Sequence, residues 1–329
     1  MNFLEQQRAN RRRTWAVMLA FVGLAIVVGL GFDLFIFGGE GGAVLPIGTA
    51  GALALSSASA ATSYFAGDRA VLRSTQAIPL DTALKTSDPD YLLRLMQLRN
   101  VVDEMAIAAG LPAPKVFVVP DPDANAFATG RDPEHASIAV TEGLLRALNR
   151  EQLQGVVAHE MAHVRNYDIR LMTVIAALVG TIALLSDWAG RMGRVAGGTR
   201  RGSRSSKSDG GGGVGGIVFL VVWLLLILLA PLLGRLLAMS VSRQREYLAD
   251  ASAAELTRNP GALADALETI ESMTGATKLV HQGSAHLCIA DPLERKIDNE
   301  EGGWADWMAT HPPMAKRVAL LRGMSYAKG

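Results

Sequence analysis

Cysteine and charge are both scarce in this chain of 329 residues. The one cysteine, Cys288, cannot form a disulfide within the chain, and nothing around it indicates a nucleophile. Charged residues make up 19% of the sequence, hydrophobic residues make up 50%, and the mean hydropathy is +0.23. The net charge is +1, and no basic stripe with interleaved aromatic residues is present, so nucleic acid is not an expected partner. This composition indicates membrane segments.

Two apolar runs near the N-terminus predict a transmembrane hairpin over residues 15–66. The first, Trp15–Phe37, is long enough to span a bilayer, and a Gly-rich turn leads to the second, Ala43–Ala66. A cleaved signal peptide fits less well, because the first run is too long and lacks a clean cleavage site. Arginines precede the first run at 11–13 and follow the second at Arg69 and Arg73. We therefore expect residues 1–14 and the chain after the hairpin to face the cytoplasm.

Residues 67–168 read as the first part of a folded domain of mixed α and β structure. Apolar spacing predicts a helix over Pro89–Ala109, ended by a Gly-Leu-Pro breaker. The further expected elements are strands at 115–119, 125–130 and 137–140, a helix beginning at Leu144, and a helix that opens at 149–151.

A second apolar hairpin is expected over residues 169–239, and its relation to the membrane stays open. Its two runs, 169–186 and 217–239, flank a Gly/Ser/Arg-rich loop at 190–216 that has no apolar period and should be disordered. If both runs cross the bilayer, this basic loop is exported against the positive-inside rule. The alternative is a hairpin that lies along or dips into the membrane, or packs on the protein. Residues 240–329 then complete the folded domain with a mostly helical pattern.

The most informative motif is His159-Glu160-Met161-Ala162-His163, an HExxH sequence in an apolar context. On a helix, the two histidines share one face and can bind one Zn²⁺. The glutamate beside the first histidine can act as a general base toward a water that the ion activates.

A zinc peptidase needs a third protein ligand, and Glu246 is the candidate. Glu246 and Asp250 are four residues apart in Ser242–Asp250, so they share a helical face. Asp250 is then placed to accept the free ring N–H of a liganding histidine. The alternative to a metal site is a solvent-exposed, charged helical face that includes Arg243 and Arg245.

With these motifs the sequence resembles the HtpX family of integral-membrane zinc metallopeptidases, which are related to the CAAX prenyl endopeptidases. The resemblance covers nearly the whole chain. It is carried by four motifs in order: Asn125–Gly130, His159–His163, Ser242–Asp250 and Thr310–Pro313.

The resemblance implies a membrane protein that is mainly α-helical, with a small β-sheet in a zincin-like (gluzincin) catalytic domain. It implies one Zn²⁺ per chain, with Glu160 as the catalytic base. The implied roles of the other residues are as follows: His159, His163 and Glu246 as zinc ligands; Asp250 as the partner of His159; His311 close to the cleft; and Asn125, Ala126, Phe127 and Ala128 as an edge strand that pairs with substrate.

The expected function is a zinc endopeptidase, multi-pass in the cell inner (plasma) membrane, with its site facing the cytoplasm. The resemblance implies membrane-protein or unfolded polypeptide substrates that are misfolded or damaged, and hence a quality-control role; the oligomeric state stays open. A non-catalytic scaffold with a structural zinc is the main alternative. Cleavage within the bilayer fits less well, because polar residues such as Glu151 and Arg165 bracket the motif. Prenyl-protein processing fits less well too, because those relatives have more spans.

Overall fold

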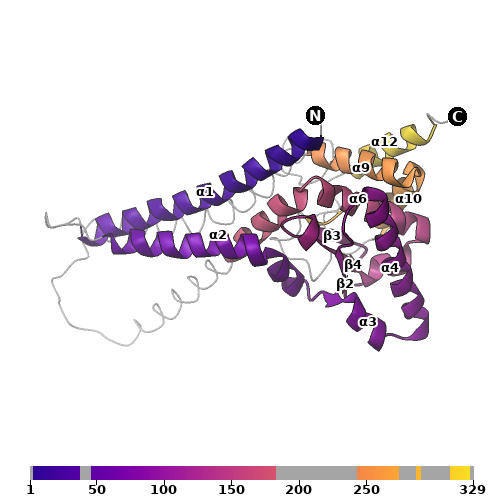
Figure 1. Ribbon diagram of the computed structural model, residues 1–329, viewed down its shortest axis with the longest axis horizontal. Helices are drawn as coiled ribbons and strands as arrows, with labels where there is room; N and C mark the ends of the chain where they lie inside the picture. The colour runs from indigo at the N-terminus through magenta and orange to yellow at the C-terminus, as the bar shows by residue number, and fades with distance from the viewer. Residues whose placement is uncertain (1–2, 38–45, 183–242, 274–286, 290–311, 327–329) are drawn as a thin grey trace, which may run out of the picture. The chain divides into compact units, whose positions relative to one another are not determined.

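The computed structural model describes residues 3–37, 46–182, 243–273, 287–289 and 312–326 (Figure 1). Within the chain, contacts define two compact units. One unit comprises residues 1–14, 63–177 and 238–329, and it contains the sheet and the HExxH motif. The other comprises residues 15–62 and 178–237, and it contains most of the first two helices.

Helices α1 (Phe3–Phe37) and α2 (Ile47–Ser74) pack closely in the second unit. A Cβ added at Gly29 would lie 2.7 Å from the carbonyl oxygen of Gly48, so only glycine permits this approach. Asp33, the one charge in the first apolar run, accepts hydrogen bonds from the backbone N–H groups of Gly48 (2.6 Å) and Thr49 (2.7 Å). Its carboxylate therefore satisfies two of the unpaired donors at the start of α2.

By length and hydropathy, α1 is the one helix among the described residues that could cross a membrane. The most apolar stretch of 18 residues within 5–31 has a mean hydropathy of 2.2, and only 17% of that stretch is buried. Leu19 and Val27 are 68% and 66% exposed. Helix α2 is richer in Ala, Ser and Gly and stays below this hydropathy, so its passage through a membrane remains a prediction. The second apolar hairpin lies largely outside the described residues, which include only its start in a helix over 168–182.

The first unit contains a small mixed sheet, which confirms the predicted combination of helices with a few strands. Its strands are β1 (Ile78–Pro79), β2 (Lys115–Val119), β3 (Ala126–Thr129) and β4 (Ser137–Thr141), in the order β1-β2-β4-β3. β2 and β4 are parallel, and the outer strands are antiparallel to their neighbours. This order leaves β3 at an edge of the sheet.

Helices surround this sheet (Figure 1). Helix α4 (Pro89–Ala109) has the predicted bounds, because Asp88 caps its N-terminus through Tyr91 N–H (3.0 Å) and Gly110 ends it with φ +66°. The remaining elements of the unit are α3 (Leu80–Thr86), the 3₁₀ turn η2 (Pro133–His135), α5 (Glu142–Ala147), α6 (Arg150–Arg165), α9 (Arg243–Thr257), α10 (Pro260–Ser272) and α12 (Met314–Tyr326).

Helix α6 is the centre of the unit and contacts α4, α9, α10 and β3. A Cβ at Gly155 would lie 3.0 Å from the backbone of Leu263 in α10, so the two helices approach almost to backbone contact. From Leu153 onward nearly every side chain of α6 is buried. The HExxH motif therefore lies in the interior of the fold rather than on an exposed helical face.

Candidate metal centre

Helix α6 fixes two histidines on one buried face. A reciprocal capping box between Asn149 and Gln152 sets where the helix begins. One turn apart, His159 and His163 are 0% and 4% exposed, and their Nε2 atoms are 3.2 Å apart. The rings meet edge to face, with centroids 4.8 Å apart. Both Nε2 atoms thus point into the same small space.

Helix α9 brings Glu246 to that space from more than eighty residues away. Glu246 is 1% exposed, and its Oε2 lies 3.6 Å from Nε2 of His159 while its Oε1 lies 3.6 Å from Nε2 of His163. The three residues form a cluster whose ligand atoms all lie within 4.8 Å of one another. The structure therefore brings together the three residues that were predicted to be metal ligands.

Two carboxylates lie behind the histidines. Asp250 Oδ1 is 2.9 Å from Nδ1 of His159, and Asp168 Oδ2 is 3.2 Å from Nδ1 of His163. A carboxylate accepts a hydrogen bond, so each Nδ1 carries the proton when the ring is neutral. Both Nε2 lone pairs then face each other across 3.2 Å beside a third carboxylate. Such an arrangement is repulsive without a cation between the three groups.

The spacing of these atoms fits a zinc ion. Protein nitrogens and oxygens lie ~2.0–2.1 Å from tetrahedral Zn²⁺, which places neighbouring ligand atoms about 3.3 Å apart. The observed separations are 3.2 and 3.6 Å. Without a metal, burial disfavours the charged ring of His159, but hydrogen bonds to Asp250 and Glu246 outweigh burial and raise its pKa to about 9. A proton therefore occupies the ligand site that a metal would take.

Glu160 lies beside the cluster without belonging to it. It is 1% exposed, and neither carboxylate oxygen makes a hydrogen bond of ordinary geometry to a described residue. Burial raises the pKa of Glu160, although His159, His163 and the backbone of Ala128 favour its charged form. A buried carboxylate with a raised pKa and no fixed partner can take up a proton and release it.

Arg317, from α12, is a site residue that the sequence did not reveal. It is fully buried and donates two hydrogen bonds to Asp250, from Nη2 to Oδ1 (2.7 Å) and from Nε to Oδ2 (2.8 Å). Its Nη1 lies 3.8 Å from Glu246 Oε2. Burial alone would raise the pKa of Asp250, but Arg317 lowers it to about 2. Arg317 therefore keeps the carboxylate behind His159 ionised and fixed in orientation.

Asp168 is held by two further residues that sequence reasoning missed. Asn10, at the start of α1, donates from Nδ2 to Asp168 Oδ1 (2.6 Å) and to the carbonyl of Asn166 (2.9 Å). Arg245 of α9 is 2% exposed, with Nη1 3.7 Å from the same Oδ1. Burial lowers the pKa of Arg245, against the opposing effects of Asp168 and Glu246. The charges around Glu246 are thus an internal network, not a solvated face.

The predicted substrate strand forms the sheet edge next to this centre. Residues Asn125, Ala126, Phe127 and Ala128 are buried, and all but the first lie in β3, which contacts α6. Asn125 Oδ1 accepts a hydrogen bond from the N–H of Ala126 (3.0 Å). His311 lies outside the described residues, so its placement near the cleft remains a prediction.

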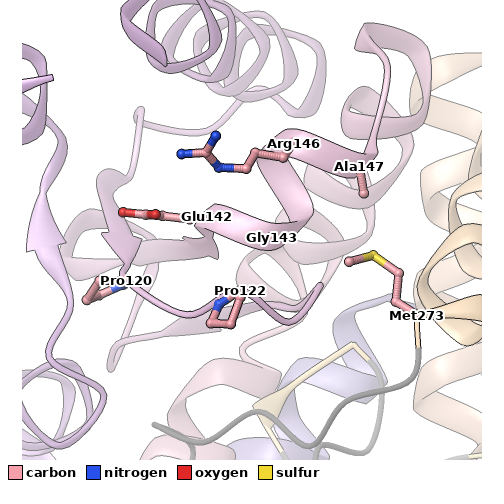
Figure 2. Close-up of a pocket in the computed structure, with 7 residues that line it drawn as sticks. All are labelled: Pro120, Pro122, Glu142, Gly143, Arg146, Ala147 and Met273. Carbon is pink, nitrogen blue, oxygen red and sulfur yellow. The ribbon is translucent and has the colours of Figure 1, made fainter. Parts of the chain in front are cut away.

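A separate cavity of about 380 Å³ lies elsewhere on the unit. Figure 2 shows its seven lining residues, among which Glu142 and Arg146 come from α5 and Met273 follows α10; the others are Pro120, Pro122, Gly143 and Ala147. None of the residues of the His–His–Glu cluster lines this cavity.

Comparisons with known proteins point to one family. Residues 93–325 match the model of peptidase family M48. A protein named "Protease HtpX homolog" from Streptococcus gordonii is 39% identical over 324 residues, which cover 97% of this chain and 99% of that protein. A protein of the same name from Caldanaerobacter subterraneus subsp. tengcongensis is 39% identical over 80% of each chain. The crystal structure of S. mikatae Ste24p matches at 16% identity and a TM-score of 0.44, over 96% of this chain and 66% of that chain.

Proposed function

The chain belongs to peptidase family M48, and we propose that it is a membrane-anchored zinc endopeptidase that cleaves unfolded or damaged proteins. Its curated relatives are named as proteases, so the resemblance predicted from the four motifs is confirmed. The observation that carries the proposed chemistry is the convergence of two Nε2 atoms and one carboxylate, with both Nδ1 atoms held by carboxylates.

The described residues can be assigned separate roles in peptide hydrolysis. His159, His163 and Glu246 would hold the ion, while Asp250 and Asp168 would fix the ring tautomers. Zinc bound there would activate a water molecule and polarise the scissile carbonyl. Three protein ligands leave the fourth position of a tetrahedral ion open, as catalytic sites require.

Glu160 would carry the proton between the two halves of the reaction. Its raised pKa, and the absence of a hydrogen bond of ordinary geometry to any described residue, suit it to accept a proton from the attacking water. The same carboxylic acid would then protonate the leaving amine nitrogen as the C–N bond breaks, which returns Glu160 to its starting state. β3 would align an extended substrate by strand addition.

The proposed membrane placement rests on α1 and on the arginines that flank the first two apolar runs. Among the helices that the structure describes, α1 is long and apolar enough to cross a bilayer. Arginines at 11–13 and at Arg69 and Arg73 support a catalytic unit that faces the cytoplasm. A site at the cytoplasmic face of the inner membrane suits quality control of membrane proteins that have lost their fold. A closed structural zinc site would need a fourth protein ligand, and the cluster among the described residues has three.

Digestion of casein by the purified full-length protein tests this proposal. We expect activity that a chelator abolishes and added zinc restores. Glu160→Gln should lose activity by about 10³-fold or more, because the general base is removed. Glu151→Gln is the matched control, because Glu151 is exposed on the first turn of the same helix, and it should remain active. A zinc-loaded wild type without activity would favour the scaffold.

A further inference from the structure

The edge of β3 is already paired with the chain itself. Phe127 and Cys288 form an antiparallel bridge, and the N–H of Ile289 donates to the carbonyl of Ala126 (3.0 Å). The other edge of β3 is paired with β4, where the N–H of Thr141 donates to the carbonyl of Asn125 (3.0 Å). Residues Leu287–Ile289 therefore occupy the outer edge, where an incoming strand would add.

The backbone of Leu287–Ile289 also makes hydrogen bonds that a bound substrate backbone would make at this site. The carbonyl of Ile289 accepts a hydrogen bond from Nη1 of Arg317 (3.0 Å). Arg317 in turn holds Asp250 and lies beside Glu246. Ile289 thus donates its backbone N–H to β3 and accepts, with its backbone carbonyl, a hydrogen bond from a buried arginine beside the metal centre. An extended peptide on β3 would need the same two partners.

The side chains of this segment are as buried as those of the core. Leu287, Cys288 and Ile289 are 3%, 2% and 1% exposed. Leu287 and Cys288 pack in the cluster that contains Phe127, and Ile289 packs in the main core beside Ala126. A competing peptide could therefore replace the segment at a low cost in free energy only if it is itself extended and apolar. It must fill the same buried space and form the same hydrogen bonds.

From these contacts we propose that Leu287–Ile289 is an internal occupant of the substrate strand, and that a substrate must exchange with it to reach Glu160. This inference rests on the proposed function, since it assigns the regulation and the substrate class of the same site. The favoured substrate is an extended apolar segment, which unfolded chains expose and folded proteins bury. The closed edge would protect folded neighbours from cleavage.

A disulfide can lock the segment in place, because Cys288 is the one cysteine in the sequence. Phe127 faces Cys288, and the hydrogen bond joins their neighbours, so the two form a non-hydrogen-bonded pair. Such pairs have a Cα separation of about 4.5 Å, which lies within the range for disulfides. Phe127→Cys should therefore form a disulfide with Cys288 on oxidation. Phe127→Cys with Cys288→Ser is the matched control that cannot form it.

The readout is peptide binding to the zinc-loaded full chain that carries Glu160→Gln. The probe is a fluorescein-labelled heptapeptide that copies residues 285–291 with serine in place of cysteine. Oxidation should weaken binding at least about tenfold, and reduction should restore it, because the competent fraction falls when the segment is fixed. The control without Cys288 should bind equally in both states.

The outcomes separate this inference from the proposed function. Equal binding by the oxidised and reduced forms overturns the inference, and so does binding by neither form. In either case, cleavage of casein by the zinc-loaded wild type shows whether the proposed function still stands. If Phe127→Cys does not fold, Ile289→Ala serves instead and should strengthen peptide binding several-fold by loosening the occupant. Ile270→Ala is its control, since Ile270 is equally buried but lies in α10; weaker binding by Ile289→Ala overturns the inference.

Discussion

Asp250 has two partners, and replacing it should affect two properties that can be separated. Its Oδ1 accepts from Nδ1 of His159, and both of its oxygens accept from Arg317. Asp250→Asn keeps the size of the side chain but removes the charge that both partners use. We expect weaker zinc binding, because the ring of His159 loses its fixed tautomer, and lower stability, because Arg317 loses its counter-ion.

The structure sets the magnitude of both effects. Removing one partner from a buried ion pair costs about 3–5 kcal/mol of stability. Loss of a carboxylate behind a metal-binding histidine lowers metal affinity about 10–100-fold, which is about 1.4–2.7 kcal/mol. The control is Asp265→Asn, whose partner Arg322 is 37% exposed and whose own side chain is 48% exposed. That pair should contribute less than about 1 kcal/mol and should leave zinc affinity unchanged.

A double variant distinguishes the two roles. Arg317→Met removes the unpaired cation that Asp250→Asn leaves behind, so the double variant should regain most of the lost stability. Its zinc affinity should stay low, because His159 still lacks its carboxylate. Unfolding is measured in denaturant with a chelator present, since bound zinc would add its own stabilisation. Zinc affinity is measured by competition with a chromophoric chelator. Recovery of wild-type zinc affinity in the double variant would refute the reasoning about His159.

Three further predictions follow from the same structure. The pKa of His159 is raised to about 9 in the metal-free protein, so below that pH zinc must displace the proton of this ring. The affinity for zinc should therefore rise about tenfold per pH unit between pH 7 and 8.5, and an affinity that does not change with pH would contradict this. Asp168→Asn should lower zinc affinity about 10–100-fold in the competition assay, as loss of an outer-shell carboxylate does; an unchanged affinity would show that its contact with the second histidine is incidental. Gly143→Ala would place a Cβ 2.0 Å from the carbonyl oxygen of Pro122 and should destabilise the protein by about 1–3 kcal/mol in denaturant, whereas Gly261→Ala meets only ordinary contacts and should not.

Local structure followed well from the sequence where capping and turn residues mark it. Asp88, Pro89 and Gly110 set the bounds of α4, and β2 was predicted residue for residue at Lys115–Val119. The short strand β1 was missed, because a strand of two residues has no periodicity to detect. The order of the strands, with β2 parallel to β4, depends on contacts between distant residues and has no local signal.

The sequence predicts only those residues of the site that lie in recognisable motifs. The spacing of His159 and His163, and of Glu246 and Asp250, follows from helical geometry. Arg317 and its role could not be found this way, because an arginine that follows a lysine in a short helix outside any motif has the pattern of a solvated residue. Asn10, Asp168 and Arg245 were missed for the same physical reason: the burial of a polar side chain depends on which elements fold over it.

The central claim is that His159, His163 and Glu246 together hold a catalytic zinc. Metal analysis of the purified full-length protein, beside the Glu246→Ala and Glu160→Gln variants, tests this claim most directly. The wild type and Glu160→Gln should each carry about one zinc per chain, because Glu160 is not a ligand, whereas Glu246→Ala should lose most of its zinc and its proteolysis. A Glu246→Ala variant that keeps a full complement of zinc and digests casein at the wild-type rate would contradict it.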